Sequence, residues 1–339
     1  MTQIDYSSLA KPVTQSDVDE FNEQYYPGKK TDLSKKNIGP EKILLIVALI
    51  VSSVVLPIVS IVGRLDFFSL AMVVVFIAFF VLVTYGAMKY SKSVFMANVK
   101  TYRFAKANGL VFNMPSDGSI HNGVIFSVGQ NRKTDIQLSN QVSGSQFEVA
   151  NYSYVIESGS GDDRTSTTYH YGYIIVKLDR KLPHILLDSR TNGSLPASMD
   201  RNQVLSLEGD FDKYFTLYCP KGYEQDALYV FSPDLMQMFI NETANYDAEI
   251  IDDQLFIYQN SSFNFTDPVS LQKIFRIIDT VGAETKHNTK HYEDMNSQAV
   301  NVEIAGSRLK SSVNPVVWVI LGVFVLIFLF QILSVFNIW

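Results

Sequence analysis

The sequence predicts an α+β soluble domain with a mostly antiparallel sheet, attached to three transmembrane α-helices (an N-terminal hairpin and a C-terminal span). Three long hydrophobic runs contain no charged residue, and the chain between the second and third runs changes from helical to alternating periodicity. The predicted parts are a polar N-terminal tail over 1–41, a transmembrane helical hairpin over 42–88, an α+β domain with an N-terminal connecting helix over 89–310, and a C-terminal transmembrane helix over 313–337.

The N-terminal tail is polar and contains one short predicted helix, over 16–25. The acidic residues of this helix are Asp17, Asp19, Glu20 and Glu23. Such a charge makes a helix a poor binder of anionic lipid surfaces. We therefore expect the tail to float free or to dock on the domain.

The hydrophobic runs cover residues 43–62, 67–88 and 316–336. A run of about twenty apolar residues crosses a hydrocarbon core of about 30 Å as a helix. Only residues 63–66 separate the first two runs, so the link predicts an antiparallel hairpin. A buried core helix or a signal peptide would be the alternative, but the first run has no cleavage-site pattern and a second run follows it.

Lysine and arginine residues near the ends of the hydrophobic runs predict the sidedness of the chain. They are Lys29, Lys30, Lys35, Lys36 and Lys42 before the first run, Lys89, Lys92, Lys100, Arg103 and Lys106 after the second, and Arg308 and Lys310 before the third. On the opposite side stands only Arg64. The positive-inside rule then predicts a multi-pass protein of the cell membrane, with the tail and the large domain in the cytoplasm and the C-terminus outside.

One pattern favours the opposite sidedness. Asn-x-Ser/Thr triplets, which would suit a glycosylated ectodomain, begin at Asn151, Asn192, Asn241, Asn260 and Asn264. A chain rich in Asn, Ser and Thr produces such triplets by chance, so we give the charge pattern more weight.

Composition and charge exclude several classes of function. The net charge of −6 disfavours nucleic acid as a partner, because phosphate binding needs a clustered basic surface. A single cysteine, Cys219, cannot form an intramolecular disulfide. The hydrophobic runs contain no Asp, Glu, Lys, Arg or His, which is typical of an anchor rather than a transporter. We expect a lipid bilayer and a protein as partners, and no cofactor; the sequence does not specify the oligomeric state.

The soluble domain begins with a connecting helix that ends at Asn108-Gly109, since glycine readily takes the left-handed conformation of a helix end. Residues 146–156 and 169–178 then alternate between apolar and polar side chains, which predicts two long strands. The stretch between them, 158–167, is polar and glycine-rich, so the two strands are predicted to form a hairpin.

The rest of the domain mixes short strands with helices. Strands are predicted over 204–207, 214–218, 228–231 and 255–258, and Asp252-Asp253 is predicted to form a hairpin turn. Ser232-Pro233-Asp234 and Asp267-Pro268 each have the capping residue and the proline that open a helix. Strands and helices in this mixed order predict an α+β domain.

Several of these stretches carry a resemblance to a known group of proteins. They are Phe211, Tyr214, Phe215 and Tyr218 (FDKYFTLY), residues 227–236 (ALYVFSPDLM), residues 253–258 (DQLFIY) and residues 182–188 (LPHILLD). The chain resembles an uncharacterised family of bacterial membrane proteins, a domain of unknown function, with an N-terminal transmembrane hairpin and a cytoplasmic α+β domain. The resemblance implies location and fold, and no activity.

One histidine pair is a weak candidate for a metal site. His287 and His291 are four residues apart and are followed by Glu293, and on a helix that spacing would place both imidazoles on one face. The alternative is a solvated connector that leads toward the third run, because lysines are interleaved and HExxH is absent.

Other motifs of site chemistry are weak or missing. Glu208, Asp210 and Asp212 alternate, but the stretch is typical of a polar turn rather than a calcium loop. Cys219 lies in an apolar stretch that ends at Pro220, as a buried thiol would. No G-x-S-x-G, G-x-G-x-x-G or phosphate-binding loop motif is present, so no catalytic or nucleotide-binding residue is predicted.

These patterns favour a membrane-anchored, non-enzymatic module whose cytoplasmic domain binds a protein partner or the lipid surface. Tyr169, Tyr171 and Tyr173 lie on one predicted strand, and tyrosine is common in interfaces, so they are the predicted contact residues. The alternative is a membrane-bound hydrolase or metal-dependent enzyme whose site is assembled from distant residues.

Overall fold

The computed structural model describes residues 4–28, 31–32, 67–118, 121–140, 146–159, 163–193, 195–196, 199–207, 209–296 and 302–311. The first and third hydrophobic runs therefore lie outside the described residues. The chain divides into two compact units: one comprises 2–112 with 265–268, and the other comprises 113–264 with the chain from 269 onward. The connecting helix thus belongs to the same unit as the N-terminal tail. Each unit is described by itself.

The first unit is built on one long helix, α4 (Phe67–Ala107), of 41 residues. It contains the second hydrophobic run and continues through the predicted connecting helix. Gly109 has a φ of +65°, and its N–H donates to the carbonyl of Lys106 at 3.2 Å, while the N–H of Leu110 donates to Ala105 at 2.9 Å. These paired bonds form the predicted left-handed helix end.

The N-terminal half of α4 exposes large apolar side chains. They include Val75, Phe76, Phe79, Leu82, Val83 and Met88. The side chains of 67–74, 77 and 80 lie outside the described residues. Within the described part of the chain, no helix has the length and apolar character needed to cross a membrane. The three spans stay a prediction.

The N-terminal tail packs on α4 through α1 (Ser7–Ala10) and α2 (Gln15–Tyr25). Thr14 caps α2, because its hydroxyl accepts from the N–H of Asp17 at 3.3 Å and its own N–H donates to that carboxylate at 2.7 Å. Asp17 also pairs with Arg103 of α4 at 2.8 Å, and Glu20 pairs with Lys106 at 2.5 Å. The tail is expected either to float free or to dock on the domain, and it docks on α4.

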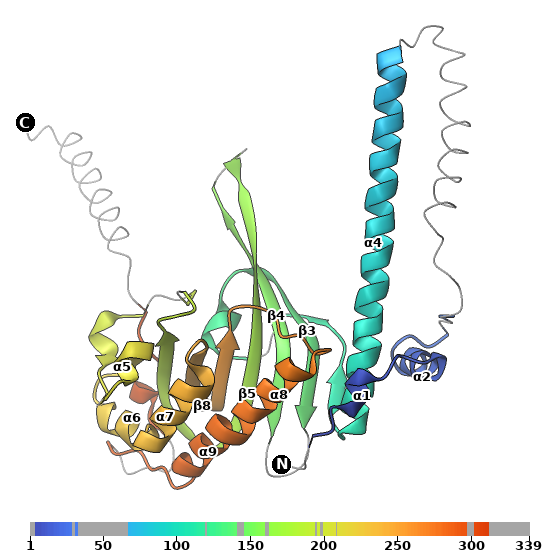
Figure 1. Cartoon of the computed structure of the whole chain (residues 1–339). Helices are drawn as coiled ribbons and strands as arrows, with labels where there is room; N and C mark the ends of the chain where they lie inside the picture. The colour runs from blue at the N-terminus through green and yellow to red at the C-terminus, as the bar shows by residue number, and fades with distance from the viewer. Residues whose placement is uncertain are drawn as a thin grey trace, which may run out of the picture. The chain divides into compact units, whose positions relative to one another are not determined.

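The second unit is built on an antiparallel sheet, which confirms the predicted α+β fold (Figure 1). β5 (Thr165–Ser189) is its central strand. One edge of β5 pairs first with β4 (Phe147–Ser158) and then with β7 (Phe215–Tyr218), and the other edge pairs with β8 (Asp247–Gln259). The remaining strands are β2 (Ser116–Asp117) and β3 (Gln130–Asn140), which continue the sheet beyond β4, and β6 (Val204–Leu205), which pairs with β7. β1 (Val111–Asn113) lies at the boundary of the two units.

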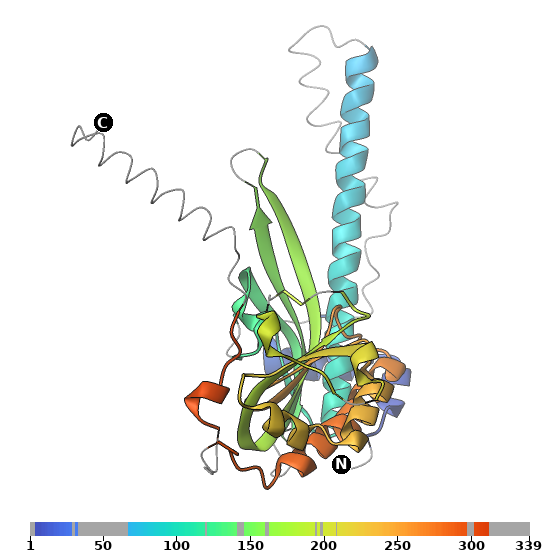
Figure 2. The ribbon, with the colours of Figure 1, turned by 90° about the vertical axis from the view of Figure 1, so that its left-hand side faces the viewer.

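The predicted long hairpin is β4–β5, and its strands reach further than the sequence pattern indicates. Its last register pair is Ser158 with Thr165. Residues 157–159 and 163–170, here called the outer hairpin, are all exposed. In both ribbon views this end of the hairpin extends beyond the rest of the sheet (Figure 2).

Helices cover one face of the sheet (Figure 1). They are α5 (Phe211–Tyr214), α6 (Glu224–Val230), α7 (Pro233–Thr243), α8 (Pro268–Ile277) and α9 (Ala283–Thr289), and a π-helical turn (Ile278–Gly282) joins α8 to α9. A Cβ on Gly282 would lie 2.9 Å from Val176 of β5, so the turn packs closely on the sheet. Both predicted helix starts are confirmed, and the Ser232 hydroxyl accepts from the N–H of Leu235 at 3.3 Å.

Two local predictions are wrong. Residues 228–230 form the end of α6 and Phe231 is its C-cap, so this stretch is not a strand. Glu224 and Asp226 in the first turn favour a helix, and a four-residue apolar run is ambiguous. Asp252-Asp253 is not a turn between two strands. β8 continues through it, with a φ of +55° at Asp252 and a shift of register, as in a β-bulge.

Candidate functional site: a buried His–Glu–Tyr network

The other face of the sheet carries a cluster of buried aromatic side chains. Its tyrosines are Tyr152 and Tyr154 of β4, Tyr171 and Tyr173 of β5, and Tyr258 of β8. Alternating residues of a strand point to one face, and the register places Tyr173 beside Tyr258. The short 3₁₀ helix η1 (Val124–Ser127) covers this face, and the Phe126 ring lies 5.1 Å from the Tyr173 ring.

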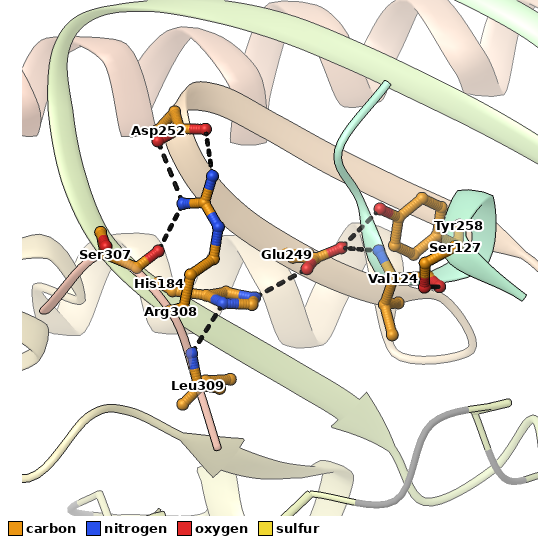
Figure 3. A network of polar contacts seen from close by, with 9 residues as sticks. All are labelled: Val124, Ser127, His184, Glu249, Asp252, Tyr258, Ser307, Arg308 and Leu309. Atoms are coloured by element: carbon orange, nitrogen blue, oxygen red, sulfur yellow. Dashed lines mark hydrogen bonds and ion pairs between the residues drawn. The ribbon is translucent and has the colours of Figure 1, made fainter. Parts of the chain in front are cut away.

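Glu249 is the centre of a polar network in this cluster (Figure 3). Its carboxylate is buried, with the residue 1% exposed. One oxygen, Oε2, accepts from the Tyr258 hydroxyl at 2.6 Å and from the N–H of Val124 at 2.7 Å. The other, Oε1, lies 2.7 Å from Nε2 of His184. A buried carboxylate needs such partners, because burial of a neutral polar group without a hydrogen bond costs roughly 2–7 kcal/mol and burial of an isolated charge costs far more.

The second ring nitrogen of His184 fixes the protonation state of the ring. Nδ1 lies 3.0 Å from the backbone nitrogen of Leu309. A backbone N–H can only donate, so Nδ1 must accept, and the proton of the neutral ring is on Nε2. Nε2 therefore donates to Glu249, and His184 connects the sheet with the C-terminal segment.

The same C-terminal segment, residues 302–311, has further contacts on the sheet. Arg308 binds Asp252 with both terminal nitrogens, at 3.1 and 3.0 Å (Figure 3). The backbone of Lys310 exchanges hydrogen bonds with the side chain of Gln203, at 2.9 and 2.8 Å. This segment directly precedes the third hydrophobic run in the sequence.

A second group on this face repeats the His–Glu–Tyr pattern. Glu148 lies 2.8 Å from Nε2 of His121 and accepts from the Tyr173 hydroxyl at 2.6 Å. Burial alone would raise the pKa of Glu148, but the hydrogen bonds from His121 and Tyr173 outweigh it and hold the pKa below its usual value. The two groups are adjacent, because Tyr173 and Tyr258 are register partners.

A pair of aspartates lies at the far end of the same face. The pairing of Leu187 with Ala248 places Asp188 and Asp247 on neighbouring strands. Burial raises the pKa of Asp247 to about 7, and the charge of Asp188 adds to the rise. A carboxyl with such a pKa suits acid–base chemistry only where a substrate can reach it. Asp247 is only 3% exposed and accepts from the N–H of Ser189 at 2.8 Å, so it has a structural role in this structure.

The residues singled out for metal binding are all exposed: His287 in α9, and His291 and Glu293 beyond it. α9 ends at Thr289, so the two histidines do not share one helix face. In the described part of the chain, no group of three or more His, Cys, Asp or Glu side chains could hold a metal ion.

The three predicted contact tyrosines differ in how far they are buried. Tyr169 is 38% exposed, whereas Tyr171 is 3% and Tyr173 is 0% exposed. The prediction of a contact surface is therefore wrong for Tyr171 and Tyr173, because other parts of the chain cover the inner half of that strand face. It stays a prediction for Tyr169, which lies in the outer hairpin.

Two further sequence features have structural roles. The Asp212 carboxylate accepts from the Ser206 hydroxyl and from the N–H of Leu207 at 3.2 Å, so it closes a turn. Cys219 is 1% exposed, and burial raises the pKa of its thiol to about 12. Glu208 lies outside the described residues.

Sequence reasoning missed the members of the His–Glu–Tyr network. His184 and Glu249 do leave a signal, since each is a polar residue inside an apolar strand pattern (LPHILLD and AEII). Such residues are buried only when paired. Comparisons with protein-family models, with curated proteins and with solved structures found no match.

Proposed function

We propose that the chain is a membrane-anchored, non-enzymatic module whose cytoplasmic α+β domain binds a protein partner through the outer hairpin. The observation that carries this proposal is the open edge of both hairpin strands. β3 pairs with β4 only as far as Val155, and β8 pairs with β5 only from Gly172. Beyond these points, within the described residues, each strand has its hairpin partner on one side alone.

An open strand edge offers a row of backbone N–H and C=O groups to an added strand. An extended segment of a partner protein pairs with such an edge, and alternate side chains of the strand then give specificity. Exposed Tyr169 and the threonines Thr165 and Thr167 supply such side chains. A protein is favoured over an anionic lipid surface, because residues 157–170 contain three acids and one arginine.

The anchoring part of the proposal is supported by the hydrophobic runs and by α4. The exposed apolar side chains of α4 form a surface that water would solvate poorly, and a bilayer would cover it. The contacts of the 302–311 segment would hold the domain close to the third run. The charge pattern around the runs supports the cytoplasmic placement.

A site-specific crosslink tests the hairpin proposal. A photo-crosslinking amino acid replaces Ser166 in the outer hairpin, and in a matched control it replaces Leu228, which is exposed at 51% on α6. We expect cells to give one discrete adduct from position 166 and none from position 228. Equal adducts at both positions, or none at either, would contradict the proposal.

A further inference from the structure

The imidazole ring of His184 connects the sheet of the second unit with the C-terminal segment through its two nitrogens (Figure 3). On the inner side, Nε2 donates to Oε1 of Glu249 at 2.7 Å. On the outer side, Nδ1 accepts from the N–H of Leu309 at 3.0 Å. His184 is only 6% exposed, so a contact that is lost here is not simply replaced by one to water.

The two contacts of the ring respond in opposite ways to an added proton. A neutral imidazole has one donor and one acceptor nitrogen, whereas both nitrogens of an imidazolium are donors. The inner contact becomes stronger, because a charged ring then donates to the carboxylate of Glu249. The outer contact is lost, because a proton on Nδ1 faces the N–H of Leu309 and neither group can accept. Rotation of the ring does not restore it, since both nitrogens are donors.

The groups around His184 make the ring the place where this network takes up a proton. A proton on Glu249 would displace a donor, because Oε2 accepts from Tyr258 and Val124 and Oε1 accepts from His184. Burial and the charge of Glu249 raise the pKa of Tyr258 well above its usual value, so its hydroxyl stays neutral. Histidine is in general the side chain whose charge changes between pH 5 and pH 8.

The other contacts of the segment 302–311 do not depend on a proton over that range. Burial alone would raise the pKa of Asp252, but the hydrogen bonds and the charge of Arg308 outweigh it and hold the pKa below its usual value. The Arg308–Asp252 ion pair, at 3.1 and 3.0 Å, is therefore kept. The backbone of Lys310 bonds to the side-chain amide of Gln203, which does not titrate. The contact at Leu309 is thus the one that a proton on His184 breaks.

We propose that protonation of His184 releases the backbone of Leu309 and loosens the segment 302–311 on the sheet. The segment leads directly into the third hydrophobic run, so uptake of a proton gives the sheet more freedom relative to that run. The buried network survives, because the charged ring stays paired with Glu249. This device is separate from the outer hairpin and does not rest on the binding of a partner.

Hydrogen exchange at single residues tests the proposal on the full chain in detergent micelles. The quantity compared is the protection factor, which is the slowing of exchange relative to an unstructured chain at the same pH. We expect the protection factor of the Leu309 N–H to be at least about fivefold lower at pH 5 than at pH 8, through loss of one hydrogen bond. The N–H of Lys310, which donates to Gln203, is the internal reference and should change less.

Two substitutions of His184 separate the two contacts of the ring. In His184→Asn, the side-chain oxygen replaces Nδ1 as an acceptor that does not titrate, so the protection of Leu309 should be the same at both pH values. In His184→Gln, the longer amide reaches Glu249 and leaves Leu309 without an acceptor, so its protection should be low at both pH values.

The unmodified chain decides the question even where a variant fails to fold, because Lys310 supplies the reference in the same sample. A protection factor of Leu309 that is equal at pH 5 and pH 8 would overturn the proposal. So would a fall at Leu309 that persists unchanged in folded His184→Asn, since another group would then be its cause.

Discussion

Gly123 lies where the backbone before η1 passes closest to the Glu249 network. A Cβ at this position would lie 2.1 Å from the Tyr258 hydroxyl oxygen and 3.1 Å from Oε2 of Glu249. No such contact is tolerated, so a side chain here must displace either the tyrosine or the η1 segment. The glycine is therefore needed for the N–H of Val124 to reach the carboxylate.

This contact predicts a compensating pair of substitutions. Gly123→Ala should lower the stability of the chain by about 1–3 kcal/mol, the usual cost of overpacking. Tyr258→Phe should cost about 1.5–3 kcal/mol by itself, because it removes one hydrogen bond to a buried carboxylate. Since it also removes the clashing oxygen, the double variant should be more stable than the sum of the two losses implies. Denaturant unfolding measures all three, and strictly additive losses would contradict the geometry.

The raised pKa of Asp247 implies that the stability of the chain depends on pH. Its pKa is raised from 3.8 to about 7 in the folded chain, mainly by burial. Between these values the folded state holds a proton that the unfolded state has lost, so the stabilising contribution of the neutral carboxyl falls as the pH rises. Above about pH 7 the carboxyl is charged in both the folded and the unfolded state, so folding carries the full free-energy penalty of burying that charge. The penalty is about 4 kcal/mol at most, since one pH unit is worth about 1.4 kcal/mol.

Asp247→Asn should therefore stabilise the chain at pH 8 and have little effect at pH 4. The asparagine Oδ1 can still accept from the N–H of Ser189, so the geometry is kept. Thermal unfolding of both proteins across this range measures the difference, with exposed Asp163→Asn as the control. A constant difference at every pH would show that Asp247 does not titrate in this window.

Among the helices and strands, the sequence predicts those whose ends are specified by residues close to them in the chain. The starts of α7 and α8 are specified by Ser232-Pro233 and Asp267-Pro268, because a cap and a proline act within one turn. The β4–β5 hairpin is specified by alternation on both sides of a polar turn. β3 was not predicted, since its sequence, QNRKTDIQLSN, is polar and contains only two apolar residues.

The sequence could not predict the candidate site, because the site is assembled by long-range contacts. Glu249 meets His184 from 65 residues away and Val124 from 125 residues away, and no local pattern encodes such pairing. Alternation does place Tyr169, Tyr171 and Tyr173 on one face, but it does not reveal which part of that face is covered. The distinction between the buried network and the outer hairpin needed the tertiary structure.

Three parts of the chain follow from these observations: the hydrophobic runs, a sheet domain and the segment that joins the sheet to the third run. The His184, Arg308 and Gln203 contacts hold this segment on the sheet at its last described residues. An anchor that follows so closely would limit how far the domain can move from the bilayer. The proposal places this domain in the cytoplasm.

Labelling of one cysteine in intact cells tests that claim most directly. The chain carries Cys219→Ser and Ser166→Cys, and the reagent is a maleimide that does not cross membranes. The unmodified chain is the control, because buried Cys219 should stay unlabelled even after lysis. For a cytoplasmic domain, we expect labelling at position 166 only after the cells are permeabilised. Labelling of intact cells would place the domain outside and contradict the account.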